Sequence, residues 1–403
     1  MWQPVIPCWF KARLMHRLNE ADMENNRYQY DLGEILVQYQ DPFKAKYQLN
    51  PGQEKAFADL TRCRTSALGG HQDECDQCGH RQHAYNSCRN RHCPKCQYVK
   101  QVEWIDRLKH NLPPTRYFHL VFTIPQELHR IFYINQKVCY DLLFQSATLA
   151  IRHAAKGRSG SGATVGGVSV LHTWGQALTY HPHIHVIIPA GGLSEDRMEW
   201  VASPGKFFLP VKVLSRIFRG IVCKNLAEVI DRGDVFLPGD FSWKALKDKL
   251  YQKNWNVYAK SLLSGPDRVI EYLGRYTHRV AISNSRILGV ENDQITFRIK
   301  DYRTDNYTST LTLPVVEFIR RFFQHVLPSG FYKIRYFGFL SLFLAKELVG
   351  LIFNLLGKSQ FLPRFEGLNG MEIYQEISGK RQRLCPVCKS GIMHPYHQNF
   401  FSD

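Results

Sequence analysis

Residues 180–192 read YHPHIHVIIPAGG, and the rest of the chain is interpreted outward from this segment. Two histidines, His183 and His185, are separated by one isoleucine, and the apolar run at residues 186–188 follows before a pair of glycines. This pattern predicts a short buried strand that ends in a turn. Because strand side chains alternate between faces, both imidazoles point the same way and can hold one divalent metal ion. The alternative is a pair of ordinary histidines in a core or at its rim.

The composition favours a polyanionic partner. The 403 residues are enough for about two or three domains, and 52 Lys and Arg against 35 Asp and Glu give a net charge of +17. Such a surplus indicates nucleic acid or an anionic membrane, although a merely basic soluble protein remains the alternative. The N-terminus lacks a secretion signal, so we expect a cytoplasmic protein.

One apolar segment could suggest a membrane span. Residues 337–356 read FGFLSLFLAKELVGLIFNLL, but Lys346 and Glu347 interrupt the segment. It therefore lacks the roughly 20 unbroken apolar residues that a span requires. We predict a buried helix here and no membrane partner.

The cysteines indicate structural zinc. Cys75-x2-Cys78, 14 intervening residues and Cys93-x2-Cys96 form a pattern typical of a four-thiolate zinc site. Zinc would replace the apolar core that so small and polar a segment cannot build. The alternative, a redox-active CxxC pair, is disfavoured by the presence of two pairs in one polar segment.

Two further sets of Cys and His residues could bind zinc. A second ion could be held in the same region by Cys63, His71, Cys88 and His92. Near the end of the chain, a small zinc knuckle could form from Cys385, Cys388, His394 and His397, or these residues could donate nothing.

A basic loop lies among the first cysteines. The sequence SCRNRHCPKC carries Arg89, Arg91 and Lys95 between metal-ligand candidates. We interpret these side chains as contacts to DNA phosphates, with a solvated loop as the alternative.

Periodicity and turn residues predict a mixture of helices and strands. Helices are predicted at residues 51–60, 101–110, 127–156, 211–230, 243–259 and 314–326. Strands are predicted at residues 116–124, 168–174, 287–290, 294–299 and 307–313.

Residues 267–279, DRVIEYLGRYTHR, carry a pair of tyrosines. On a helix, Tyr272 and Tyr276 lie one turn apart on the same face, and Arg275 and Arg279 add positive charge beside them. The alternative, usual for an isolated YxxxY, is that both rings pack into a core.

Taken together, four motifs resemble one family. FTIP on an early strand, HPHIH on a later one, YLGRY on a helix and SCRNRHCPKCQ in a cysteine cluster resemble the two-tyrosine HUH transposases of rolling-circle insertion sequences, the insertion-sequence-ninety-one type. The resemblance extends from about residue 51 to residue 337 and implies an α+β fold. An HUH domain, with a central antiparallel sheet flanked by helices, would follow an N-terminal zinc-binding domain. The implied segments are an N-terminal extension (1–45), a zinc-binding DNA-recognition domain (46–111), the HUH nuclease domain (112–345) and a C-terminal helical segment (346–403).

The resemblance also implies a chemistry. His183 and His185 would hold Mg²⁺ or Mn²⁺, with Gln176 as the expected third ligand and His119 and His181 as alternatives. Tyr272 or Tyr276 would attack single-stranded DNA at the ends of the element and leave a 5′-phosphotyrosine. An unperturbed phenol has a pKa near ~10, so the ion and Arg275 or Arg279 must assist.

This chemistry implies a biological setting. The enzyme would drive rolling-circle transposition on nucleoid DNA in the bacterial cytoplasm, with host replication proteins as candidate partners. The zinc domain would recognise the terminal DNA of the element.

Three rival functions share part of this pattern. A rolling-circle replication initiator would use the same residues for a replicon. A non-catalytic zinc DNA-binding regulator would need only the zinc module. A metal phosphodiesterase acting through water would need the histidines but no tyrosine.

Overall fold

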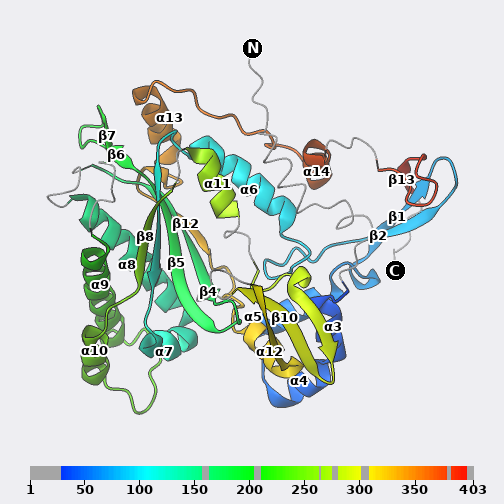
Figure 1. Ribbon diagram of the computed structural model, residues 1–403, viewed down its shortest axis with the longest axis horizontal. Helices are drawn as coiled ribbons and strands as arrows, with labels where there is room; N and C mark the ends of the chain where they lie inside the picture. The colour runs from blue at the N-terminus through cyan, green and yellow to red at the C-terminus, as the bar shows by residue number, and fades with distance from the viewer. Residues whose placement is uncertain are drawn as a thin grey trace. The chain divides into compact units, whose positions relative to one another are not determined.

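Figure 1 shows the computed structural model of the chain, which describes residues 29–156, 163–203, 210–262, 265–274, 280–300, 308–378 and 383–396. The chain divides into two compact units that are each discontinuous in sequence. Unit 1 contains residues 1–103, 278–326 and 365–403, and unit 2 contains residues 104–277 and 327–364. The sequence led us to expect four consecutive segments instead. The α+β class is confirmed: both units combine helices with antiparallel sheets.

Unit 2 is built on a five-stranded antiparallel sheet with the predicted histidine strand at its centre. The strand order is β12 (Ile334–Phe337), β4 (Gly167–Trp174), β5 (Tyr180–Pro189), β3 (Tyr117–Thr123) and β8 (Val257–Leu262). On one side, β5 pairs with β3, so that His185 lies opposite Val121, and on the other side it pairs with β4. A central strand that is hydrogen-bonded along both edges is a rigid base for functional side chains.

Helices cover one face of this sheet, as Figure 1 shows for the ribbons at its left. They are α7 (His129–Ile134), α8 (Gln136–Lys156), α9 (Val211–Asp231) and α10 (Trp243–Gln252). Phe122 of β3, Ile184 of β5 and Phe218 of α9 share the core beneath them and are almost fully buried. Burying each such side chain contributes about 1.5–3 kcal/mol. Alternation then turns the other residues of each strand, including His183 and His185, to the opposite face.

Three predicted elements of unit 2 need correction. The predicted helix 127–156 is split into α7 and α8 at Asn135, whose side-chain amide donates to the carbonyl of Phe236 at 2.8 Å. The predicted helix 243–259 ends at Gln252, and β8 follows it. The predicted buried helix 337–356 is interrupted. Its helical parts are the 3₁₀ turn η4 (Gly338–Leu340) and the helix α13 (Ala345–Leu355), and Phe343 between them is 90% exposed.

The remaining elements of unit 2 are short. They include α6 (Tyr98–Asn111), which starts in unit 1, the hairpin of β6 (Gly191–Leu193) and β7 (Trp200–Ala202), and α11 (Pro266–Gly274). Within the described part of the chain, no helix has both the length and the apolar character that a membrane crossing needs.

In unit 1, one group of helices packs against a three-stranded sheet. The helices are α3 (Leu32–Gln38), α4 (Gln40–Lys46), α5 (Pro51–Arg62) and α12 (Val315–Phe323), and the strands are β9 (Ile287–Glu291), β10 (Gln294–Lys300) and β11 (Thr308–Pro314). Phe43, Phe57 and Phe323 stack with ring centroids 5.7–6.4 Å apart. Because α5 begins in a capping box at Asn50, the predicted start of this helix at Pro51 is confirmed.

A second small sheet of unit 1 joins segments from the two ends of the chain. β13 (Met393–Tyr396) pairs with β1 (Gly70–Cys75), which pairs in turn with β2 (Arg81–Tyr85). Nearby in sequence, α14 (Gly370–Ser378) places Ile373 against Val102 of α6 in a separate apolar cluster. The C-terminal residues are therefore part of the module that the first cysteines build.

Candidate functional site

Three histidines gather on the open face of the five-stranded sheet. His172 on β4 lies directly opposite His183 on β5 in the strand register, and His185 is the next residue on the same face of β5. One ring nitrogen of each lies within 4.8 Å of the others. Two of the three, His183 and His185, are the predicted pair, and their shared face confirms the alternation argument.

Hydrogen bonds fix how two of these rings present their nitrogens. The Nδ1 of His183 lies 2.7 Å from the carbonyl oxygen of His181, so Nδ1 is the protonated donor and Nε2 carries the lone pair. The Nδ1 of His185 lies 3.0 Å from the Nε2 of His119 on β3. If His185 donates through Nδ1 to His119, its Nε2 is also a lone-pair donor to an ion. Such outer hydrogen bonds commonly set the tautomer of metal-binding histidines.

The electrostatics of the cluster favour neutral rings. Burial lowers the pKa of His119 to about 3 and the pKa of His183 to about 4. Both rings are therefore neutral at pH 7, and the neutral imidazole is the form that ligates metal ions. The residues present fit a divalent cation bound through nitrogen.

His172 is the member of the histidine cluster that the sequence interpretation missed. It lies 11 positions before His183, and only the antiparallel register of β4 and β5 brings the two together. The predicted third ligand, Gln176, lies in the turn that joins these strands, beyond the last paired residue of β4. Of the two alternatives, His119 contacts His185 from the neighbouring strand, whereas the exposed His181 offers its carbonyl group to His183.

The predicted tyrosine helix is present as α11. Pro266 begins it, and Lys109 of α6 holds its first turn through an ion pair of 2.7 Å with Asp267. Within this helix, Val269 and Ile270 are buried. The backbone of Tyr272 belongs to α11, but its side chain, like Tyr276, Arg275 and Arg279, lies outside the described residues.

A further phenol, Tyr258, lies on the same face as the histidines. Val121 of β3 is paired with Tyr258 on one side and with His185 on the other, so all three side chains share a face. The Tyr258 ring is 52% exposed, and its centroid lies 6.1 Å from that of His119. This tyrosine provides a matched control for any variant of the predicted nucleophiles.

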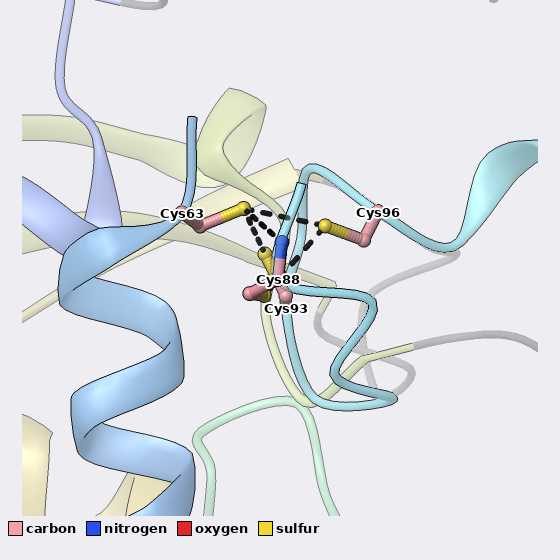
Figure 2. A group of neighbouring side chains, drawn as sticks. All are labelled: Cys63, Cys88, Cys93 and Cys96. Carbon is pink, nitrogen blue, oxygen red and sulfur yellow. Dashed lines mark hydrogen bonds between the residues drawn. The ribbon is translucent and has the colours of Figure 1, made fainter. Parts of the chain in front are cut away.

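Figure 2 shows the first cysteine cluster, in which Cys63, Cys88, Cys93 and Cys96 point toward one another. The Sγ atoms of Cys63 and Cys96 are 3.3 Å apart, those of Cys63 and Cys93 3.5 Å and those of Cys88 and Cys96 3.7 Å. A regular tetrahedron with Zn–S bonds of about 2.3 Å has S···S edges of about 3.8 Å. The cluster therefore fits one zinc ion with four thiolate ligands.

The second cysteine cluster combines the two ends of the chain. Cys75 and Cys78 face Cys385 and Cys388, with each Sγ within 4.8 Å of the others. The expected joining of the Cys75 pair with the Cys93 pair is wrong, because the structure places these pairs in different clusters. The pattern of 14 intervening residues did not reveal this, since the true partners lie 307 positions away.

The histidines proposed as zinc ligands lie elsewhere in their modules. His71 contacts Asp73 at 3.4 Å, and His394 contacts Asp76 at 3.6 Å. The backbone N–H of His92 donates to Asn90, and its ring is not part of the four-cysteine group beside it. His397 lies outside the described residues. The described part of the zinc module therefore groups thiolates alone.

The basic loop differs from the expectation of three projecting cations. Arg89 is exposed, at a positive φ of 54°. Arg91 is half-buried, and its burial lowers the pKa of the guanidinium. Lys95 instead holds the module together, donating to Asp31 at 3.2 Å and to the carbonyl of Cys63 at 3.0 Å. Arg89 is thus the member of the three with its side chain most open to a partner.

Comparisons with known proteins point to transposases. A family model described as "Putative transposase" matches residues 166–347, and one described as "Transposase zinc-binding domain" matches residues 35–124. Over 375 residues the chain is 40% identical to "Putative transposase y4qJ" of Sinorhizobium fredii strain NGR234, covering 90% of this chain and 94% of that protein. It is also 31% identical over 300 residues to the transposase for insertion sequence element IS801 of Pseudomonas savastanoi pv. phaseolicola, covering 70% of this chain and 68% of that protein. No solved structure matches the chain.

The matched ranges divide the sites unequally. Residues 166–347 contain the three clustered histidines and α11. Residues 35–124 contain the whole first cysteine cluster, but only the Cys75 and Cys78 half of the second.

Proposed function

The chain belongs to the family of insertion-sequence transposases of the IS91 type with an N-terminal zinc-binding domain, and on that premise we propose that it nicks and rejoins single-stranded DNA through a phosphotyrosine. The observation that carries this proposal is the convergence of His172, His183 and His185 on one face of a rigid sheet. The presence of a tyrosine-bearing helix in the same unit supports it. The substrate would be the single-stranded ends of an element in the bacterial cytoplasm, in concert with host replication proteins.

The three histidines would hold the catalytic Mg²⁺ or Mn²⁺, with Gln176 available as a further ligand in the adjoining turn. When bound, the ion would polarise the scissile phosphate and offset its developing negative charge. Mg²⁺ prefers oxygen ligands, whereas imidazole suits softer cations. We therefore expect Mn²⁺ to support the reaction at lower concentration than Mg²⁺.

Tyr272 or Tyr276 would be the nucleophile. A phenolic oxygen would form a bond to phosphorus in line with the departing 3′-oxygen, and the bond between phosphorus and that oxygen would break. The phenol loses its proton, and the leaving strand ends in a 3′-hydroxyl group. Arg275 and Arg279 would stabilise negative charge on the phenol and phosphate. The same step in reverse, with a 3′-hydroxyl attacking the phosphotyrosine, rejoins the strand.

The zinc-binding domain would position the DNA. In this proposal a structural Zn²⁺ in the Cys63, Cys88, Cys93 and Cys96 cluster fixes the loop that carries Arg89. Arg89 would then contact DNA phosphates, which makes binding sensitive to salt. Arg91 would contribute less, because it is half-buried.

Covalent attachment to DNA tests the proposal. Labelled single-stranded DNA from the end of an element, incubated with the protein and Mn²⁺, should yield a protein–DNA band that survives SDS. His172→Ala and His183→Ala should each reduce the adduct at least 100-fold at limiting Mn²⁺, whereas Tyr258→Phe, on the same face, should retain it. Cleavage without any covalent species would instead establish hydrolysis by water and overturn the proposal.

A further inference from the structure

The second cysteine cluster has the geometry of a metal site assembled from two halves. The Sγ atoms of Cys75 and Cys388 are 3.7 Å apart, and those of Cys78 and Cys385 are 3.6 Å apart. These separations are close to the S···S edge of about 3.8 Å in a tetrahedral zinc–thiolate site. They are far longer than the ~2.05 Å of a disulfide bond.

In both halves, backbone N–H groups point at cysteine sulfur atoms. In the first half, the N–H groups of Gln77 and Cys78 point at the Sγ of Cys75, each at 3.5 Å. In the second, the N–H of Val387 points at the Sγ of Cys385 at 3.4 Å, and that of Gly391 at the Sγ of Cys388 at 3.3 Å. N–H groups directed at sulfur stabilise thiolates, the form that ligates zinc.

The two halves are also locked together by contacts outside the cysteines. The carboxylate of Asp76 accepts from the N–H of Ile392 at 2.7 Å, and the buried Asp73 pairs with Arg383 at 2.5 Å. A Cβ added to Gly391 would lie only 2.4 Å from the Sγ of Cys75. The turn of the second half therefore packs directly onto a ligand of the first, and only glycine fits there.

Among the residues that the structure describes, the small sheet has no apolar core that could replace a metal ion. Its buried cluster consists of Cys75, Cys385 and Met393, with Cys388 packed against them. A cluster made chiefly of four sulfur atoms contributes little hydrophobic stabilisation, and four thiolates held together without a cation would repel one another. A bound ion that favours four thiolate ligands would remove this repulsion.

We propose that Cys75, Cys78, Cys385 and Cys388 bind a second structural Zn²⁺, which fastens the C-terminal segment to the N-terminal zinc module. Neither half can form the site alone, because each supplies two ligands. Zinc binding by the N-terminal module is consequently incomplete without residues 383–396. This site does not depend on the proposed DNA chemistry.

Metal counting on the full chain tests the proposal. Zinc per chain is measured by plasma mass spectrometry for the wild type, for Cys75→Ser with Cys78→Ser, for Cys385→Ser with Cys388→Ser, and for all four changes together. Each double variant should lose one zinc, and the quadruple variant should lose no more than one. Val387→Ala is the matched control, because Val387 is 63% exposed between the C-terminal cysteines and should leave the count unchanged.

Two outcomes would overturn the proposal: unchanged zinc in the C-terminal double variant, or additive losses of two zinc ions in the quadruple variant.

A second measurement uses the wild type alone, so that it does not rely on variants that fold. After chelation and mild oxidation, trypsin separates the cysteines of the two clusters into peptides 63–64, 65–81, 82–89, 92–95, 96–100 and 384–389. Disulfides should join peptide 65–81 to peptide 384–389, and links from 65–81 to 92–95 or 96–100 in their place would contradict the site.

Discussion

At the scale of single residues, the central feature is the chain of imidazoles across three neighbouring strands. His119 on β3 contacts His185 on β5 at 3.0 Å, and His183 on β5 faces His172 on β4. His119 is too deeply buried to be charged at neutral pH, since burial lowers its pKa to about 3. In the proposed metal site, the His119 ring would hold a proton on the Nδ1 of His185 and so orient the Nε2 of His185 toward the ion.

His119→Phe should weaken metal binding without removing the nucleophile. Losing an outer hydrogen bond to a metal ligand typically costs 10–100-fold in affinity, so the Mn²⁺ concentration for half-maximal adduct formation should rise by about that factor. His119→Gln, whose amide oxygen can accept the same hydrogen bond, should restore much of the affinity. Titrating adduct formation with Mn²⁺ checks this, and equal defects in the two variants at saturating Mn²⁺ would show that His119 is merely structural.

Residue-level prediction from sequence succeeded where the signal was local. His183 and His185 are two positions apart on one strand, so alternation alone put them on a shared face. His172 and the C-terminal cysteines gave no such signal, because their partners are far away in the sequence and only strand pairing brings them together. The second zinc site shows this most clearly: CxxC spacing identified both pairs of cysteines, but not which pairs meet.

At the scale of elements, the apolar runs in the sequence were the most informative about where strands lie. β3, β4 and β5 lie where the apolar runs predicted them, within a residue or two at each end. β8 was missed because its sequence, VYAKSL, directly follows a helical pattern, and its strand conformation depends on pairing with β3. The strand propensity of the local sequence could not reveal that β8 pairs with β3.

The turn after β12 gives an element-level prediction. Gly338 has a φ of +60°, and an added Cβ would lie 1.8 Å from the carbonyl oxygen of Val165. Gly330 has a similar φ of +69° but open space around it. Gly330→Ala should therefore cost only the left-handed backbone penalty of about 1 kcal/mol, whereas Gly338→Ala should cost clearly more. Thermal unfolding compares the melting temperatures of the two variants. Equal decreases in melting temperature would show that the backbone around Gly338 moves to make room for the added Cβ.

Helix α12 gives a pH-dependent prediction. Glu317 accepts hydrogen bonds from Arg320 at 2.6 Å and from Arg321 at 2.7 Å, and chiefly the Arg320 bond lowers its pKa to about 2. Because the folded pKa lies below the ordinary value of 4.5, the stabilisation is complete above that value and is lost as the pH falls toward 2. Glu317→Gln should thus lower the melting temperature at pH 7, by an amount corresponding to about 1 kcal/mol.

The difference between wild type and Glu317→Gln should shrink when melting is measured at pH 3.5. Glu54→Gln, an exposed carboxylate in the first turn of α5, controls for the loss of one negative charge near a helix start. A difference that grows on acidification would mean that the arginine contacts do not stabilise the folded protein.

At the scale of the whole molecule, neither unit corresponds to one continuous stretch of sequence. Residues 278–326 and 365–403 belong with the N-terminal module, which the motif order alone could not indicate. The first 103 residues thus share a unit with the last 39, joined in the small sheet by the register of β1 with β13. Sequence motifs revealed the family and predicted a chemistry, whereas the make-up of each unit depends on pairings between distant segments.

The most direct test of the account is to map the residue that becomes attached to DNA. Trypsin separates Tyr272, in peptide 269–275, from Tyr276, in peptide 276–279, and both from Tyr258, in peptide 254–260. We predict that mass spectrometry of the Mn²⁺-dependent adduct finds the nucleotide on peptide 269–275 or 276–279, and that Tyr272→Phe with Tyr276→Phe abolishes the adduct while DNA binding persists. A nucleotide on peptide 254–260, or an adduct that persists in the double variant, would contradict the account.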